Sequence, residues 1–379
     1  MMQKIVNFIQ NLYNTTDFIP LHEPRFRGNE KKYLNECIDS TFVSSVGKFV
    51  NRFEEEFASY VGSKYAIATV NGTSALHVSL LLADVKAGDE VITQALTFVA
   101  TCNAIKYCQA EPVFVDVGLD TLGMSPDALE SFLKKNCEVQ NGVCLNTATN
   151  KTIKAVVPMH TFGHPCKIDT IAEICKAWHL TLIEDAAESL GSFYKGRHTG
   201  TFGKSAVFSF NGNKIITSGG GGVIITDDEE LAKRAKHLTT TAKLPHPYEY
   251  EHNTIAYNYR LPNLNAALLV AQMEQLETFL QNKRFLSQEY MQFFKQFDDI
   301  DFIKEPKDAK SNYWLNAIIL KDKKQRDTYL KYLNENGVMS RPIWRLMSEL
   351  EMFQNCQNDG LQNSKFLSER IINIPSSVL

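Results

Sequence analysis

Along the chain, the spacing of apolar and polar residues switches repeatedly between a strand-like and a helical period. From Lys64 onward, short runs rich in β-branched residues are separated by stretches in which apolar residues recur at helical spacing. The strand-like runs are KYAIATV, EVITQAL, EPVFVDV, IKAVVPMH and TLIEDAA, and the helical stretches include SALHVSLLLA, FVATCNAIKYC and DTIAEICKAWH. Strands that alternate with helices in this way predict a mainly parallel sheet with crossover helices.

The alternation breaks down after Thr201. Only a loop separates SAVFSF from GGVIIT, and it is too short for a crossover helix, so a local hairpin or mixed pairing is expected there. The sheet is therefore predicted to be mixed. The segment CEVQNGVCLNTATNK is predicted to be a surface excursion inserted before a core strand.

A polar stretch divides the chain in two. TTTAKLPHPYEYEHNT follows the helical run EELAKRAKHL and is too irregular for a core element. Beyond it, long helical runs reach about Phe297, and YWLNAIIL, KQRDTYLKYLNENG and VMSRPIW predict a strand, a helix and a second strand. The predicted division is an N-terminal segment 1–50, a large domain 51–255 and a small C-terminal α/β domain 256–379.

Composition narrows the classes of protein that fit this pattern. A chain of 379 residues is long enough for two lobes. Its net charge of -3 gives no positive field for a nucleic-acid backbone, so no nucleic-acid partner is expected. The N-terminus lacks the apolar core of a signal peptide, and no run approaches ~18 apolar residues. We expect a cytoplasmic protein without a membrane partner.

The eight cysteines contain no Cys-x-x-Cys pair and no Cys/His cluster at zinc spacing. They are therefore interpreted as buried free thiols in a reducing compartment, and no metal site is expected.

The first candidate for chemistry is VNGTSALHVSL, in which a strand-like run ends and a helix begins. Gly72 permits a sharp turn, and Thr73 and Ser74 supply hydroxyls and early helical N–H groups. Because the helix dipole favours an anion there, the segment could bind a phosphate. An ordinary Ser/Thr helix cap is the alternative.

The second candidate is LIEDAAESLGS, where Glu184 and Asp185 end an apolar strand. A carboxylate at the C-terminal end of such a strand faces the crevice in which open α/β sheets bind ligands. Asp185 could then pair with a cationic cofactor nitrogen. The alternative is a loop carboxylate that caps the following helix.

The third candidate, SAVFSFNGNKIITSGGGGVIIT, is the most specific. Apolar runs flank Lys214, so its amine is expected to be partly desolvated and its pKa lowered toward the nucleophilic free base. Ser209 can offer a hydroxyl to a phosphate, and the glycines Gly219 to Gly222 let backbone approach a flat ring. A glycine-rich hairpin is the alternative for these glycines.

Two further segments add weaker signals. In LTFVAT, Phe98 follows a strand and could stack on an aromatic cofactor, although a core phenylalanine is the more common explanation. In AYNYRLPNLNAALL, Asn258 and Arg260 precede a helix and could reach a phosphate or carboxylate.

Together, these segments resemble a known family. NGTSALH, TFVAT, EDAAESLG, VFSFNGNK with SGGGG, and YNYRLPNLNAAL, in this order, resemble the DegT-type sugar-nucleotide aminotransferases of pyridoxal-phosphate fold type I. HEPRFRGNEKKYLNECIDSTFVSSVGKFVNRFEEEF resembles the LegC-type members. The resemblance implies a large domain with a mixed, mostly parallel seven-stranded sheet between helices, a smaller C-terminal α/β domain, and pyridoxal 5'-phosphate as cofactor.

The resemblance also implies roles for individual residues. Lys214 would form the Schiff base with the cofactor and shuttle protons, Asp185 would pair with the pyridine nitrogen, and Phe98 would stack on the ring. The phosphate would be held by Gly72, Thr73, Ser74 and Ser209, and by Asn258 of the neighbouring subunit, which implies a homodimer. Glu188 stands where the family more often has Gln or His beside the phenolic oxygen of the cofactor, and a carboxylate there repels a phenolate unless a proton is shared.

The implied reaction moves an amino group from L-glutamate to a nucleotide-linked 4-keto-6-deoxy sugar. The LegC-like segment favours UDP-linked 4-keto-6-deoxy-N-acetylglucosamine, used for legionaminic-acid or bacillosamine-like bacterial surface sugars. A dehydratase branch of the family has histidine at the Schiff-base position, and Lys214 argues against that reaction. The alternatives are a non-catalytic pyridoxal-phosphate-binding regulatory protein and another fold type I enzyme.

Overall fold

A mixed β-sheet runs through the centre of the large domain. The computed structural model describes residues 1–379, and the main path of this sheet has the strand order β1-β11-β10-β7-β6-β2-β3. These strands are β1 (Tyr65–Thr69), β11 (Gly222–Thr226), β10 (Ser205–Ser209), β7 (Thr181–Asp185), β6 (Lys151–Val157), β2 (Glu90–Gln94) and β3 (Glu111–Val115). β11 pairs antiparallel with both β1 and β10, whereas the pairs from β10 to β3 are parallel. The predicted mixed, mostly parallel sheet and the close pairing after Thr201 are confirmed.

The predicted surface excursion forms a β-hairpin. Strands β4 (Cys137–Gln140) and β5 (Val143–Asn146) pair with each other, and β5 pairs with β6, which makes the whole sheet nine-stranded. Residues at the hairpin turn are exposed, while the β6 core strand that follows is mostly buried.

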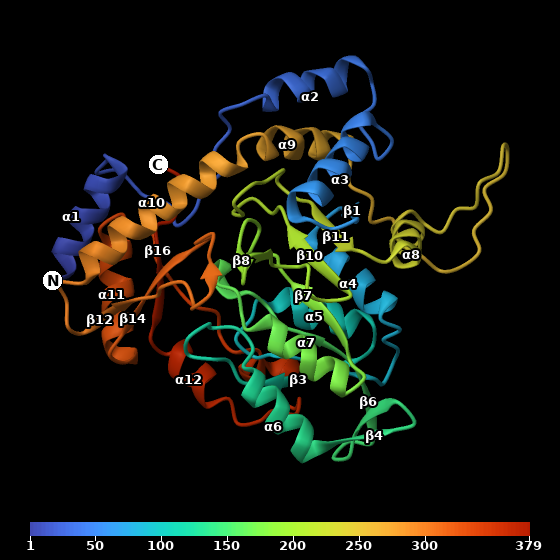
Figure 1. The fold of residues 1–379 in the computed structure, drawn as a ribbon. Coiled ribbons are helices and arrows are strands. Elements are labelled where there is room, and N and C mark those ends of the chain that lie inside the picture. The colour runs from blue at the N-terminus through green and yellow to red at the C-terminus, as the bar shows by residue number, and fades with distance from the viewer.

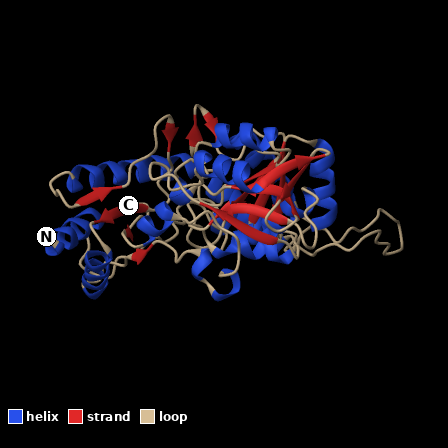
Figure 2. Ribbon diagram, turned by 90° about the horizontal axis from the view of Figure 1, so that it is seen from below, coloured by secondary structure: helices blue, strands red, loops and turns tan.

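Helices cover both faces of the large sheet (Figure 2). They are α2 (Glu30–Asp39), α3 (Lys48–Val61), α4 (Gly72–Leu82), α5 (Val99–Tyr107), α6 (Pro126–Asn136), α7 (Ile168–Ala177), α8 (Glu229–Thr239) and α9 (Asn263–Met273). Successive residues of β10 point to opposite faces, so Val207 packs with α4 and α8 while Phe208 packs with α3 and α9. Because both faces are buried, the central strands read as nearly continuous apolar runs.

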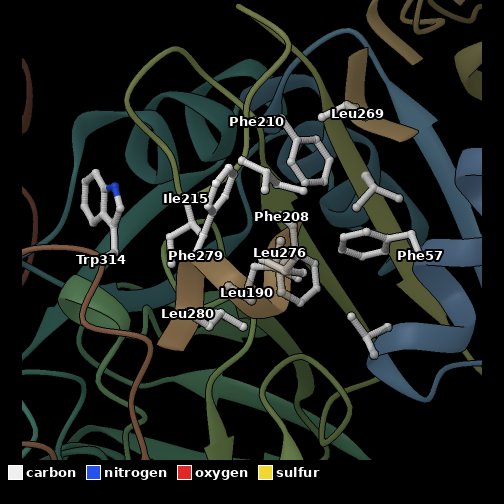
Figure 3. Packing of buried hydrophobic residues seen from close by; sticks show 14 of the residues in the cluster. Phe57, Leu190, Phe208, Phe210, Ile215, Leu269, Leu276, Phe279, Leu280 and Trp314 are labelled. Atoms are coloured by element: carbon white, nitrogen blue, oxygen red, sulfur yellow. The ribbon is translucent and has the colours of Figure 1, made fainter. Parts of the chain in front are cut away.

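A group of aromatic rings joins α3 to β10 (Figure 3). The Phe57 ring lies 5.2 Å from Phe208 and 5.6 Å from Phe210, measured between centroids, in edge-to-face geometry. Such pairs stabilise beyond the burial of their apolar area. The packing fixes the end of β10, from which the chain continues toward Lys214.

The small domain is built on an antiparallel sheet with the order β12-β14-β16-β15. Its strands are β12 (Ile300–Phe302), β14 (Asn316–Leu320), β16 (Ile371–Ile374) and β15 (Arg341–Pro342). The accompanying helices are α1 (Met2–Tyr13), α10 (Leu276–Phe294), α11 (Lys323–Glu335) and α12 (Gln362–Ser368). The predicted run YWLNAIIL forms β14 only from Asn316 onward, and VMSRPIW contributes only the short β15. A separate three-stranded sheet contains β13 (Ala309–Lys310), β8 (Phe193–Tyr194) and β9 (Arg197–His198).

The two domains are interlocked in sequence and in space. Helix α1 packs in the core of the small domain, and α9 packs on α2 and α3 of the large one (Figure 1). The long helix α10 contributes Leu276 and Phe279 to the large core and Tyr290 and Phe294 to the small core. The divisions at residues 50 and 255 remain a prediction, and the packing of α1 and α9 crosses both.

The polar stretch after α8 forms an arm that projects from the body of the molecule (Figures 1 and 2). Its two limbs are joined by a hydrogen bond of 2.8 Å from the Leu244 N–H to the Glu251 carbonyl. Tyr248, Tyr250 and Ile255 are 90%, 82% and 88% exposed. The arm therefore presents unburied aromatic and aliphatic surface.

All eight cysteines are free thiols. None of the helices combines the length and the apolar character that a membrane crossing requires.

Replacing Phe57 with alanine should destabilise the protein by roughly 3–5 kcal/mol, because the ring is fully buried and leaves a cavity. Urea denaturation followed by circular dichroism measures the loss. Phe285→Ala is the matched control: its ring is 51% exposed, so a change within about 0.5 kcal/mol is expected. Equal losses in the two variants would show that the aromatic group does not stabilise the α3–β10 contact.

Candidate active site

A cavity of about 320 Å³ lies where β7 and β10 end and α4 begins. Ligands of open α/β sheets bind at this kind of position, outside the carboxyl ends of the strands. Trp314 and Trp344, which come from the small domain, line the cavity as well. The cavity thus lies between the two domains.

The beginning of α4 forms one wall. The Asn71 side chain caps the helix by accepting a hydrogen bond of 2.8 Å from the Ser74 N–H. Gly72 and Thr73 line the cavity, whereas Ser74 is buried and does not. The predicted cap is therefore present, but Asn71 supplies it, and the first turn of the helix faces the cavity with its N–H groups.

Two glycines allow the strands to approach this helix closely. A Cβ on Gly72 would lie 2.9 Å from the Ser209 Cβ, and one on Gly222 would lie 2.5 Å from the backbone carbon of Asn71. Gly222 is also the partner of Ser209 in the β10–β11 register. The Ser209 hydroxyl is consequently held beside the helix N-terminus, and together they form a seat for an anion.

Asp185 is at the end of β7 and lines the cavity. One of its oxygens accepts a hydrogen bond of 2.6 Å from the Thr101 hydroxyl, and the other accepts one of 3.2 Å from the Ala187 N–H. Burial raises the pKa of Asp185, while these two donors and the charge of Lys214 oppose that shift. No helix begins after Asp185 before β8, so the alternative role as a helix cap is wrong.

Glu184 points away from the cavity. Its carboxylate accepts hydrogen bonds from the N–H groups of Gly200, Phe202 and Gly203 and lies 3.1 Å from His160 Nε2. Adjacent residues of a strand face opposite sides, which separates Glu184 from Asp185. Glu184 thus holds the loop that follows β9.

Lys214 lies in the loop after β10, with its side chain only 14% exposed. Its amine is 3.5 Å from Glu188 Oε1 and 3.8 Å from the centroid of the Trp314 ring. Burial lowers the pKa of the amine, against the opposing charges of Glu188 and Asp185. This environment favours a lysine that can act as a free base.

Glu188 is buried next to Lys214. Its second oxygen accepts a hydrogen bond of 2.9 Å from the Phe162 N–H. Phe162 belongs to the short helix η1 (Thr161–Gly163) and has a φ of 58°, a conformation uncommon for a residue with a side chain. Burial raises the pKa of Glu188 to about 7, although the charge of Lys214 lowers it.

Phe98 lies at the mouth of the cavity. Half of its surface is exposed and the ring contributes to the cavity lining, so it is not a core phenylalanine. Asn258 does not line the cavity of its own subunit. It is exposed at the base of the arm and accepts a hydrogen bond of 3.1 Å from Arg260 Nε.

Thr101, Phe162 and Trp314 are among the residues of this site that were not singled out from the sequence. Thr101 comes from α5, Phe162 from η1, and Trp314 from the small domain. Trp314 is anchored by a hydrogen bond of 2.6 Å from its indole N–H to the Asn213 carbonyl, next to Lys214. Thr101 falls within the helical run FVATCNAIKYC. A hydroxyl on the inward-facing side of that helix was the available sequence signal for a role of Thr101 at the site.

The residues present fit a flat aromatic cofactor that carries a phosphate and an aldehyde. The anion seat at Gly72 and Ser209, the amine of Lys214 and the carboxylate of Asp185 all border one cavity, and its volume suits a small cofactor. The Phe98 ring supplies an aromatic surface at its edge. This donor set matches the requirements of pyridoxal 5'-phosphate.

Comparison with known proteins agrees with this geometry. GDP-perosamine synthase of Escherichia coli O157:H7 is 38% identical over 360 residues, covering 95% of this chain and 93% of that protein. GDP-perosamine synthase of Vibrio cholerae is 36% identical over 361 residues, covering 94% of both. The aminotransferase TlmJ from Streptoalloteichus hindustanus has the same fold, with a TM-score of 0.85 at 25% identity over 95% of this chain and 93% of TlmJ.

The family model for DegT/DnrJ/EryC1/StrS aminotransferases matches residues 24–379. The predicted enzyme class, cofactor and fold are therefore confirmed. This chain belongs to the DegT/DnrJ/EryC1/StrS aminotransferase family and is a pyridoxal-phosphate-dependent aminotransferase of fold type I.

Proposed function

We propose that the enzyme transfers an amino group from L-glutamate to a nucleotide-linked 4-keto-6-deoxy sugar. The observation that carries the proposal is the buried amine of Lys214, which shares one cavity with Asp185 and the anion seat. The names of the relatives at 36–38% identity support a nucleotide-sugar substrate. The eight free thiols fit a reducing compartment, so we place the enzyme in the cytoplasm.

Each residue of the site has a task in this reaction. Gly72, Thr73 and Ser209 would hold the cofactor phosphate, Ser74 would support this turn from behind, and Phe98 would cover the ring. Bound pyridoxal phosphate supplies an electron sink for the charge that develops on the donor's α-carbon. Asp185 would keep a proton on the ring nitrogen, because its carboxylate is fixed by Thr101 and Ala187 and lines the cavity.

Lys214 carries the proton in this scheme. With the cofactor and an amino donor bound, the free amine Nζ would take the proton from the donor's α-carbon and release it again within the same cavity. Positioned proton transfer of this kind contributes roughly 10²–10⁴-fold to the rate. The lowered pKa of Lys214 favours the unprotonated amine that this step needs.

An assay has to determine which nucleotide the acceptor sugar carries. The LegC-like N-terminal segment favours UDP-linked 4-keto-6-deoxy-N-acetylglucosamine and a legionaminic-acid or bacillosamine-like pathway. The names of the two relatives favour a GDP-linked sugar. Both lines of argument agree on a keto sugar joined to a nucleoside diphosphate.

We also propose that the enzyme works as a homodimer. Asn258 lies outside the cavity of its own subunit, and the arm that follows α8 exposes Tyr248, Tyr250 and Ile255. Exposed apolar surface on a projecting segment is typical of an interaction site. A second copy that covers the arm would allow Asn258 to contact the phosphate in the partner's cavity.

Incubation of the holoenzyme with L-glutamate and a panel of UDP- and GDP-linked 4-keto-6-deoxy sugars should produce 2-oxoglutarate with one acceptor. A coupled dehydrogenase assay measures the product, and Lys214→Ala is the inactive control. If the cofactor is bound and no acceptor in either series supports 2-oxoglutarate formation, the proposed substrate class is wrong.

Asp185→Asn should bind the cofactor but lose roughly 10²–10⁴-fold in kcat, because a neutral amide no longer keeps the ring nitrogen protonated. Cofactor absorbance and steady-state kinetics measure the two effects separately. Asp169→Asn, a partly buried carboxylate that pairs with Lys195, is the control and should keep its kcat. A kcat near wild type in Asp185→Asn would remove the residue from the mechanism.

Mixing Lys214→Ala subunits with Asn258→Ala subunits should raise activity above that of either parent. In the mixed dimer, one of the two sites combines an intact Lys214 with an intact Asn258 from the other subunit. Native mass spectrometry confirms subunit exchange. Mixed dimers that stay at the parental level would show that Asn258 does not act across the interface.

A further inference from the structure

Lys214 and Glu188 form a buried pair of opposite charges in the wall of the cavity. The Glu188 residue is 4% exposed, and Lys214 is the only cation within ion-pair distance of it. One Glu188 oxygen is occupied by the Phe162 N–H, which leaves Oε1 facing the amine at 3.5 Å. The carboxylate therefore has no second charged partner when Lys214 loses its proton.

Other charged groups surround this pair, so the gain or loss of a single proton changes the balance of charge in the buried space. The charge of Asp185 acts on both members of the pair, and the charge of His160 acts on Asp185. Burial lowers the pKa of His22, and the charge of Lys214 lowers it further. Two carboxylates and one amine thus share a buried space. Asp185 accepts two hydrogen bonds, whereas Glu188 accepts only one from outside the pair. Of the two, Glu188 is the carboxylate that is less stabilised as an anion.

We propose that Glu188 is the proton partner of Lys214: it takes a proton from the Nζ ammonium and later returns it. One N–H bond breaks and one O–H bond forms, so the pair stays neutral and the amine is freed without water. This assignment rests on the proposed function of Lys214 and adds the group that sets its protonation state.

The neighbours of the pair support a direct transfer. The Trp314 ring covers the amine at 3.8 Å, and its indole N–H is tied to the Asn213 carbonyl. Phe162 packs against Trp344 with 5.2 Å between ring centroids, which fixes the N–H that orients Glu188. A distance of 3.5 Å is longer than a hydrogen bond, but catalytic contacts are often long before the ligand binds.

The first test measures how pH controls the reactivity of Lys214 in the apoprotein. Lys214 is labelled with acetic anhydride over a range of pH and quantified by peptide mass spectrometry. The Glu188 carboxylate stabilises the ammonium form, so Glu188→Gln should lower the pKa of Lys214 and shift half-labelling down by about 1–3 pH units. An unchanged labelling profile would overturn the proposal.

The matched control for this test is Glu184→Gln. It makes the same change in a buried carboxylate that faces His160 and backbone N–H groups, so the labelling profile of Lys214 should stay as in the wild type. Thermal melting of each variant shows whether it is folded. Neither measurement uses the amino donor or the sugar, so a failure of the proposed substrate class would leave the result intact.

The second test observes Glu188 itself. In apo Lys214→Met the carboxyl group has lost its only cation, so it should be protonated at neutral pH. Its burial raises its pKa to about 7 even beside the lysine charge. Infrared spectroscopy should then show a carboxylic-acid band that disappears in Lys214→Met/Glu188→Gln. A Glu188 that remains ionised from pH 5 to 8 without the lysine would refute the assignment.

Discussion

The close approach of α4 to the ends of β10 and β11 determines the rest of the site. Contact between a helix N-terminus and two strand ends requires backbone where a side chain would normally stand, and Gly72 and Gly222 provide it. With a Cβ at either position, the helix would have to move away from Ser209. The anion seat, the direction of the loop to Lys214 and the depth of the cavity all follow from this contact.

The motif EDAAE places three carboxylates close together in the sequence, but each carboxylate meets a different environment in the folded protein. Glu184 faces backbone N–H groups and His160, Asp185 receives a hydroxyl and one N–H, and Glu188 has one N–H and a lysine. The strand pleat separates the first two, and the turn after β7 returns the third to the cavity. Charge at this site is therefore set by the donors that each residue meets.

The sequence predicted the parts of the site that lie at strand ends. Asp185 and Ser209 end apolar runs, and Lys214 lies in the loop that follows the second run. The rule that ligands bind at the carboxyl ends of parallel strands brings them together. The mixed sheet was predictable as well, because the loop before Gly222 leaves no room for a crossover helix. Trp314 could not be predicted in this way, since it is 100 residues from Lys214 in the chain and no local pattern records contact between domains. The packing of α1 on the small domain was hidden for the same reason, because its partners lie near the opposite end of the chain.

Helix α10 has a mechanical consequence. One end is embedded in the large core through Leu276 and Phe279, and the other in the small core through Tyr290 and Phe294. A continuous helix anchored at both ends acts as a stiff strut, so the domains cannot swing apart without bending it or pulling one end out of its core. Trp314 packs in the same cluster as Leu276 and Phe279, at the first end of this strut, and this packing keeps its ring in register with Lys214 while substrates come and go (Figure 3). Access for a large nucleotide sugar then depends on loops, and the two cores act as one rigid frame.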